Sequence, residues 1–87
     1  MKISVFSSEY ELVLVEKCHT LLSDAEAAVQ GNKIYICKEL TEDERIHALV
    51  HEIMHVLHPY KEERDVHMEA LVLTDTLLVN GMISWPE

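Results

Sequence analysis

The sequence predicts a small α+β domain in which a short antiparallel sheet, including a β-hairpin, packs on two long helices. Apolar residues recur at spacings of three and four in residues 41–58, and residues 61–80 contain no Gly or Pro to break a helix before Gly81. A Gly-Asn pair between two apolar runs, in residues 27–37, is typical of a β-hairpin. The 87 residues, 48% of them hydrophobic, are enough for one domain spanning residues 1–87 and too few for a second.

The N-terminal segment predicts a short strand followed by a helix. Residues Lys2–Phe6 alternate apolar with polar side chains, which favours a strand. The segment Ser8–Glu11 has capping-box spacing. The residues that follow at helical intervals are Leu12, Val15, His19 and Leu22, with His19 expected at the surface. We therefore expect a helix here, with a buried strand over residues 12–15 as the alternative.

Residues 41–58 predict a well-capped amphipathic helix. Thr41 and Glu44 have the spacing of a capping box, and Pro59 ends the helix. Its buried side is expected to consist of Ile46, Leu49, Val50, Ile53, Met54 and Leu57.

This helix contains the pentapeptide His51-Glu52-Ile53-Met54-His55, which has the HExxH pattern. Side chains four residues apart lie one above the other on a helix, so both imidazoles can reach one metal ion. Glu52 lies beside the pair, where it can accept a proton from a water held by the metal. The pattern therefore predicts a Zn²⁺ site with His51 and His55 as ligands and Glu52 as the catalytic base.

The second helix, from about Lys61 to Asn80, is expected to supply the third ligand and to end before Gly81. Projected at about 100° per residue, His67 falls between two apolar strips, whereas Glu69 falls on the polar side. We predict that His67 is the third zinc ligand, with Glu63 and Glu69 as alternatives.

The stretch from His47 to His58 resembles the metal helix of the ImmA/IrrE group of zincin-type metallopeptidases, which often has a further His three residues after its HExxH. The second helix of that group has a pattern like E-x-x-A-N-x-F-A-x-x-L-L-x-P, which is similar to residues 67–80 at Ala70, at the apolar residue three later and at the paired leucines. The family's ligand-type Glu falls on His67. The resemblance implies a minimal zincin-like fold, peptidase activity, and a strand at Lys33–Cys37 that pairs with an extended peptide substrate.

Composition limits the partners. The formal net charge of −9 argues against nucleic acid, whose binding requires clustered Lys and Arg, and favours a basic or neutral protein partner. No apolar run has the length of a membrane span, and residues 1–4 do not form a signal peptide, so we expect a cytoplasmic protein. Cys18 and Cys37 are then expected to be reduced and buried. The oligomeric state is not predicted.

Two functions are consistent with these features. The first is zinc-dependent hydrolysis of a protein or peptide, in which Glu52 takes a proton from water and passes it to the leaving amine. The alternative is a non-catalytic regulatory or protein-binding module with a structural zinc, in which a residue such as His47, His58 or Glu63 provides a fourth protein ligand.

Overall fold

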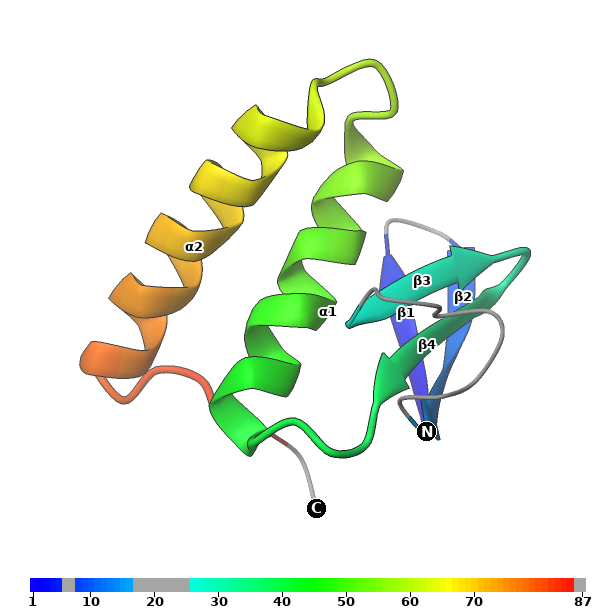
Figure 1. Cartoon of the computed structure of the whole chain (residues 1–87), viewed down its shortest axis with the longest axis horizontal. Coiled ribbons are helices and arrows are strands. Elements are labelled where there is room, and N and C mark those ends of the chain that lie inside the picture. The colour runs from blue at the N-terminus through cyan, green and yellow to red at the C-terminus, as the bar shows by residue number, and fades with distance from the viewer. Residues whose placement is uncertain (6–7, 17–25, 86–87) are drawn as a thin grey trace.

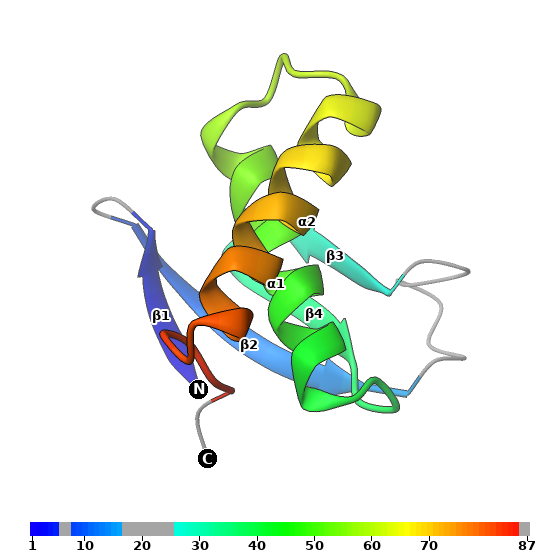
Figure 2. The same ribbon diagram turned by 90° about the vertical axis from the view of Figure 1, so that its left-hand side faces the viewer.

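The computed structural model describes residues 1–5, 8–16 and 26–85 and has a four-stranded sheet and two helices in these ranges. The strands are β1 (Lys2–Val5), β2 (Ser8–Val15), β3 (Ala27–Gln30) and β4 (Lys33–Cys37), and the helices are α1 (Glu42–Leu57) and α2 (Glu63–Val79). The sheet packs on one side of α1, and α2 packs on the other (Figures 1 and 2). The predicted α+β class is confirmed.

The sheet is mixed, so the prediction of an antiparallel sheet was wrong. Its strand order is β1-β2-β4-β3, with antiparallel pairs at both ends and a parallel β2–β4 pair between them. The predicted helix after Ser8 was also wrong, because Ser8–Val15 forms β2, hydrogen-bonded to strands on both sides. Residues 17–25, which include the rest of that predicted helix and Cys18, lie outside the described residues.

The β3–β4 hairpin was predicted correctly. Gln30 pairs with Lys33, which leaves Gly31 and Asn32 as a two-residue turn, and Gly31 has a φ of 60°, a conformation that suits glycine. Strand β4 lies in the interior of the sheet and provides the fully buried Ile34 and Ile36. The buried core against α1 consists of Leu12, Ile34, Ile36, Ile46, Ala48 and Trp85.

Helix α1 begins and ends where the sequence predicts. The Thr41 hydroxyl accepts a hydrogen bond from the Glu44 backbone N–H (3.2 Å), and the Glu44 carboxylate accepts one from the Thr41 N–H (2.9 Å). At the other end, the His58 N–H donates to the Met54 carbonyl, and Pro59 follows. The capping box satisfies backbone donors that the first turn cannot pair within the helix.

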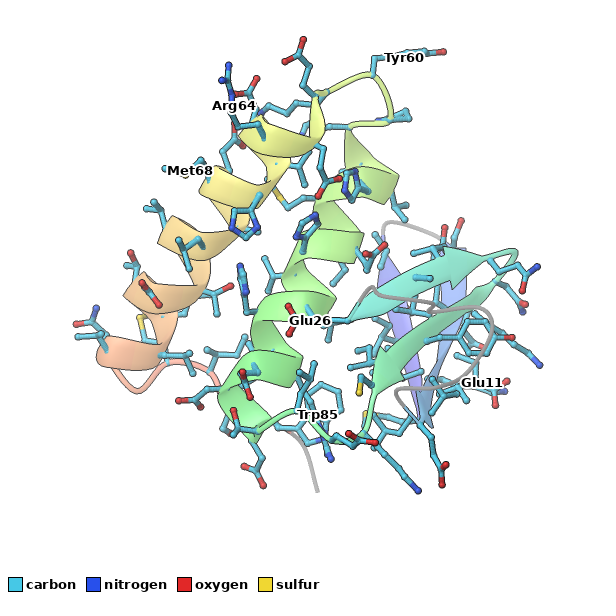
Figure 3. The ribbon with its side chains drawn as sticks, viewed as in Figure 1. Glu11, Glu26, Tyr60, Arg64, Met68 and Trp85 are labelled. Carbon is cyan, nitrogen blue, oxygen red and sulfur yellow. The ribbon has the colours of Figure 1, made fainter. Side chains whose placement is uncertain are left out.

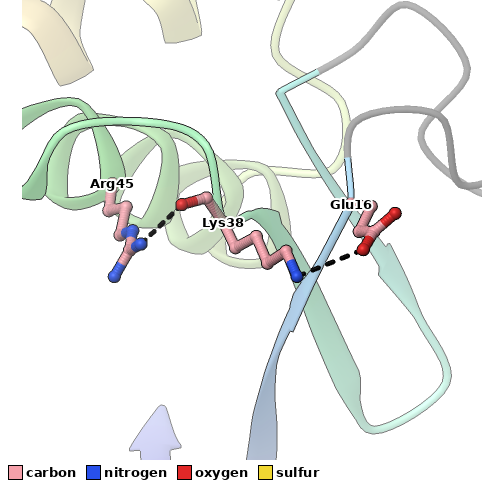
Figure 4. A network of polar contacts seen from close by, with 3 residues as sticks. All are labelled: Glu16, Lys38 and Arg45. Atoms are coloured by element: carbon pink, nitrogen blue, oxygen red, sulfur yellow. Dashed lines mark hydrogen bonds and ion pairs between the residues drawn. The ribbon is translucent and has the colours of Figure 1, made fainter.

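Polar contacts join the start of α1 to the end of the sheet (Figure 4). The Arg45 guanidinium donates to the Lys38 carbonyl (2.6 Å), and the Lys38 ammonium pairs with the Glu16 carboxylate (3.2 Å). The same guanidinium lies 5.7 Å from the centre of the Trp85 ring. These contacts hold α1 in a defined position relative to the ends of β2 and β4.

Helix α2 buries a narrow strip against α1, formed by Val66, Ala70 and Thr74. Its C-terminus is a Schellman motif, because the Gly81 N–H donates to the Leu78 carbonyl and the Met82 N–H to the Leu77 carbonyl. Gly81 has a φ of 64°, as expected for the residue after the helix. Neither α1 nor α2, the two helices of the described residues, is long and apolar enough to cross a bilayer.

Candidate metal centre

Three side chains from the two helices converge at one end of the helix pair. The Nε2 atoms of His51 and His55 lie 3.0 Å apart on α1. The Glu63 carboxylate of α2 contacts both, with one oxygen 2.6 Å from His51 Nε2 and the other 2.6 Å from His55 Nε2. Without a metal, imidazole N–H groups can donate to these carboxylate oxygens. The three groups thus face one another as in a metal site.

The local sequence explains this convergence. His51 and His55 are one helical turn apart, and residues 58–62 turn the chain back after Pro59. Glu63 is the first residue of α2, so the short connection places its side chain beside the last turns of α1. The side chains of the two histidines are 17% and 31% exposed and that of Glu63 is 68% exposed, which places the centre at the protein surface, open to solvent.

The centre lies in a cleft of about 470 Å³ between α1, α2 and the start of β3. Its walls contain Glu26, Ala27, His47, Ala48, His51, Glu52, His55, Glu63 and His67. Figure 3 shows Glu26 at the start of β3, beside α1. The cleft therefore combines four imidazoles with three carboxylates, next to the edge of the sheet.

Glu52 lines this cleft, as its predicted role requires. Burial raises the pKa of the Glu52 carboxyl, and nearby Glu63 raises it further, whereas His55 and His51 lower it. The net shift is upward, so the metal-free protein makes this carboxylate a better proton acceptor than an exposed Glu.

Two further histidines form the wall of the cleft one turn away. The rings of His47 and His67 are 5.5 Å apart, and the His67 ring is 5.6 Å from that of His51. Burial lowers the pKa of His47, and the nearby His67 and His51 lower it further, while Glu26 and Asp75 raise it. His47 Nε2 is buried and has no hydrogen-bond partner among the described residues. His47 and His67 therefore add polar groups to the cleft beside the convergent trio.

The predicted third ligand, His67, lies on the α1-facing side of α2 as the projection indicates, although its side chain is exposed. Its assignment as a ligand stays a prediction, because Glu63 is the residue in contact with both His51 and His55. Glu69 is directed elsewhere and pairs with Lys61. Glu63 was predicted only as an alternative; the short connection after Pro59, which was not used in that prediction, is the sequence signal that points to it.

Several other polar side chains are not part of the trio. His58 is exposed at the end of α1, and Tyr60 is fully exposed, pointing away from the helices in Figure 3. His19 lies outside the described residues. Cys37 is a free thiol buried under the sheet, as the sequence predicted.

The donor set fits zinc. Two imidazole nitrogens and a carboxylate oxygen are ligands that catalytic zinc commonly uses. Zinc bonds of about 2.0–2.1 Å in a tetrahedral site separate neighbouring ligand atoms by about 3.3 Å. The observed separations of 2.6 and 3.0 Å are shorter than this by about 0.7 and about 0.3 Å, so the side chains would have to move apart by that much to admit the ion.

Comparison with known proteins finds no family model, no curated protein and no solved structure that matches this chain.

Proposed function

We propose that this protein is a zinc-dependent peptidase with a minimal zincin-like fold, in which His51, His55 and Glu63 hold the metal. The observation that carries the proposal is the contact of one α2 carboxylate with both imidazoles of the HExxH helix, in a cleft that Glu52 also lines. Zinc held by two histidines and a carboxylate would keep a fourth position for water, which is the arrangement of catalytic rather than structural zinc.

Bound zinc supplies a Lewis acid that lowers the pKa of a coordinated water and polarises the scissile carbonyl. Glu52 accepts a proton from the attacking water and then delivers it to the leaving amine. The water oxygen first bonds to the carbonyl carbon, and the amide C–N bond then breaks as the amine nitrogen receives the proton, which yields a carboxylate and an amine. His47 and His67 line the wall of the cleft and can donate hydrogen bonds to the substrate.

The substrate is proposed to be an extended peptide that lies along β3. The earlier expectation that Lys33–Cys37 pairs with substrate was wrong, because β4 is hydrogen-bonded to β2 on one side and to β3 on the other. Among the described residues, β3 pairs only with β4, and Ala27 of β3 lines the cleft. A peptide added at this edge would run beside the metal ligands by the β-augmentation mode of recognition.

Zinc uptake is the first test. Protein prepared without a histidine tag, stripped with a chelator and titrated with zinc should bind one ion per chain, as measured by elemental analysis and calorimetry. His51→Ala and His55→Ala should each abolish stoichiometric binding. A folded chain that takes up no zinc would end the proposal.

Peptide hydrolysis is the second test. The zinc-loaded protein is incubated with a peptide library derived from a proteome, and new termini are identified by mass spectrometry. Glu52→Gln should retain zinc and lose about 10²- to 10⁴-fold in rate, because the amide cannot accept the proton. If the Gln variant cleaves as fast as the parent, the activity is a contaminant or the mechanism is wrong.

A non-catalytic module with structural zinc is the second candidate, favoured by the presence of His47 and His67 near the same ligands. X-ray absorption spectroscopy distinguishes the two. A site with three protein ligands and one water supports the peptidase, whereas a fourth protein ligand supports the structural role.

A further inference from the structure

The outward face of α2 carries a strip of apolar side chains that the fold leaves uncovered. Met68, Val72 and Leu73 are 54%, 61% and 45% exposed, and the strip continues to Val79 (84%) and Met82 (72%). Figure 3 shows Met68 pointing away from α1. Only Val66, Ala70 and Thr74 of this helix are fully buried. Since α2 needs one apolar face to pack on α1, its second apolar face has no role in the fold described.

The strip contains a shallow groove of about 420 Å³ lined by Met68, Glu69, Val72, Leu73 and Thr76. The one hydroxyl in this groove is already satisfied, because the Thr76 Oγ1 donates to the Val72 carbonyl (2.8 Å). The next polar side chain, Asn80, likewise donates to the Thr76 carbonyl (2.8 Å). Because these side chains are already hydrogen-bonded within α2, a partner that covers the groove would bury mainly apolar surface.

Charge indicates the kind of partner. The strip is bordered by Asp65, Glu69 and Asp75, with Arg64 at its start and Lys61 paired to Glu69, in a chain of net charge −9. A second copy of the chain would bring together two proteins that each have a net charge of −9 and repel each other. A partner with Lys or Arg beside its apolar residues has the complementary charge.

We propose that the outward face of α2 is a docking surface for an amphipathic helix of another protein, with an apolar stripe flanked by basic residues. From Met68 to Val79 the strip covers about 16 Å of helix, at a rise of about 1.5 Å per residue, which matches about three turns of a partner helix. Apolar side chains at spacings of three and four on that helix would fill the groove between Met68 and Val72. The proposal does not depend on the peptidase activity.

The test uses a synthetic peptide of about 17 residues, with leucines at spacings of three and four and lysines elsewhere on its flanks. Isothermal titration calorimetry measures its Kd, and NMR chemical-shift changes locate the binding site. Two control peptides have the same length: one in which leucine and lysine positions are shuffled, and one with glutamate in place of every lysine. The basic amphipathic peptide should bind at the α2 strip, and both controls should bind at least about tenfold more weakly.

Matched variants of the protein test whether the side chains of the α2 strip contribute to peptide binding. Met68→Gln and Val72→Gln should each weaken binding by about tenfold or more, since each removes apolar contact area. Leu14→Gln changes an apolar residue of β2 that is 41% exposed and should leave the Kd unchanged. Circular dichroism and thermal unfolding check that all three remain folded.

Three results would overturn the proposal: no binding at about 1 mM peptide, equal binding of the shuffled or acidic peptide, or equal Kd values for the Val72 and Leu14 variants. A further contrary result is a dimer, seen by sedimentation equilibrium of the protein alone, that Val72→Gln dissociates. In that case the strip is covered by a second copy.

Discussion

Helix α1 lies between the sheet and α2, whereas α2 packs mainly against α1 (Figure 1). The two helices also begin differently. A reciprocal capping box fixes the first turn of α1, while the N-cap of α2, Glu62, makes no side-chain capping bond. Yet both contribute to the proposed zinc site, α1 through His51 and His55 and α2 through Glu63. Helix α1, which packs against both the sheet and α2, thus holds the two histidines in place. Helix α2 adds the third proposed ligand.

The largest expected effect is on zinc affinity, and it shows whether a residue of α2 is a metal ligand. Glu63→Gln should weaken zinc binding by more than the 10- to 100-fold that loss of an outer hydrogen-bond partner costs, because a metal ligand is lost. His67→Ala should remain within that range. Competition with a chromogenic chelator measures both affinities. The opposite order would make His67 the ligand and return Glu63 to a hydrogen-bonding role.

The second prediction compares the packing of the two helices with the same kind of substitution. Ile46→Ala in α1 removes a side chain that is 3% exposed and should destabilise the metal-free protein by about 2–5 kcal/mol. Val72→Ala in α2 changes a side chain that is 61% exposed and should alter stability by no more than about 0.5 kcal/mol. Urea unfolding measures both values. Comparable losses would mean that the outward face of α2 is covered within the domain.

The smallest effect concerns the N-terminus of α1. Thr41→Ala should cost about 1 kcal/mol by removing the cap. Hydrogen bonds from the Thr41 backbone N–H and then its hydroxyl group lower the pKa of Glu44 below its ordinary value of 4.5. Stability from this carboxylate is therefore present above that value and is lost as the pH falls through the lower folded pKa.

The difference between parent and Thr41→Ala should accordingly shrink between about pH 7 and about pH 3. Chemical unfolding at the two pH values measures it, with Glu44→Gln as the control that removes the titrating group. Because Thr41→Ala keeps the backbone N–H that donates to the Glu44 carboxylate, a difference that does not change with pH would show that the Thr41 hydroxyl does not stabilise this carboxylate.

The sequence predicts the two helices because their signals are local. A capping box, apolar spacing and Gly81 act within a few residues, and all three are observed. Strand β2 could not be predicted in this way. Ser8–Glu11 imitates a helix cap, and Leu12 with Val15 fits a helical period, but pairing with residues 33–37 favours the extended chain. Tertiary contacts overrode a weak local preference.

The candidate metal centre likewise depends on tertiary contacts that local sequence patterns do not predict. The HExxH spacing is enough to predict which imidazoles share a helix face, and the structure places their Nε2 atoms 3.0 Å apart. A helical projection also places His67 on the side of α2 that faces α1, as observed. A helical projection shows which side of a helix a residue faces, but it does not show which residues of the neighbouring helix lie opposite it. The turn at residues 58–62 determines how the two helices are aligned along their length, and it brings Glu63 opposite His51 and His55.

The parallel β2–β4 pair has a consequence for the order of folding. Both antiparallel strand pairs and the α1–α2 pair join segments that are neighbours in sequence, but the parallel pair joins Glu11 to Lys33 and Val15 to Cys37. Closing that longer loop costs more chain entropy, so we expect the parallel pairing to form late and the helical pair early. Substitutions of Val13, in the parallel pair, should then change mainly the unfolding rate in stopped-flow experiments. His51, His55 and Glu63 all belong to the helical pair, so the proposed zinc ligands would be assembled before the sheet is complete.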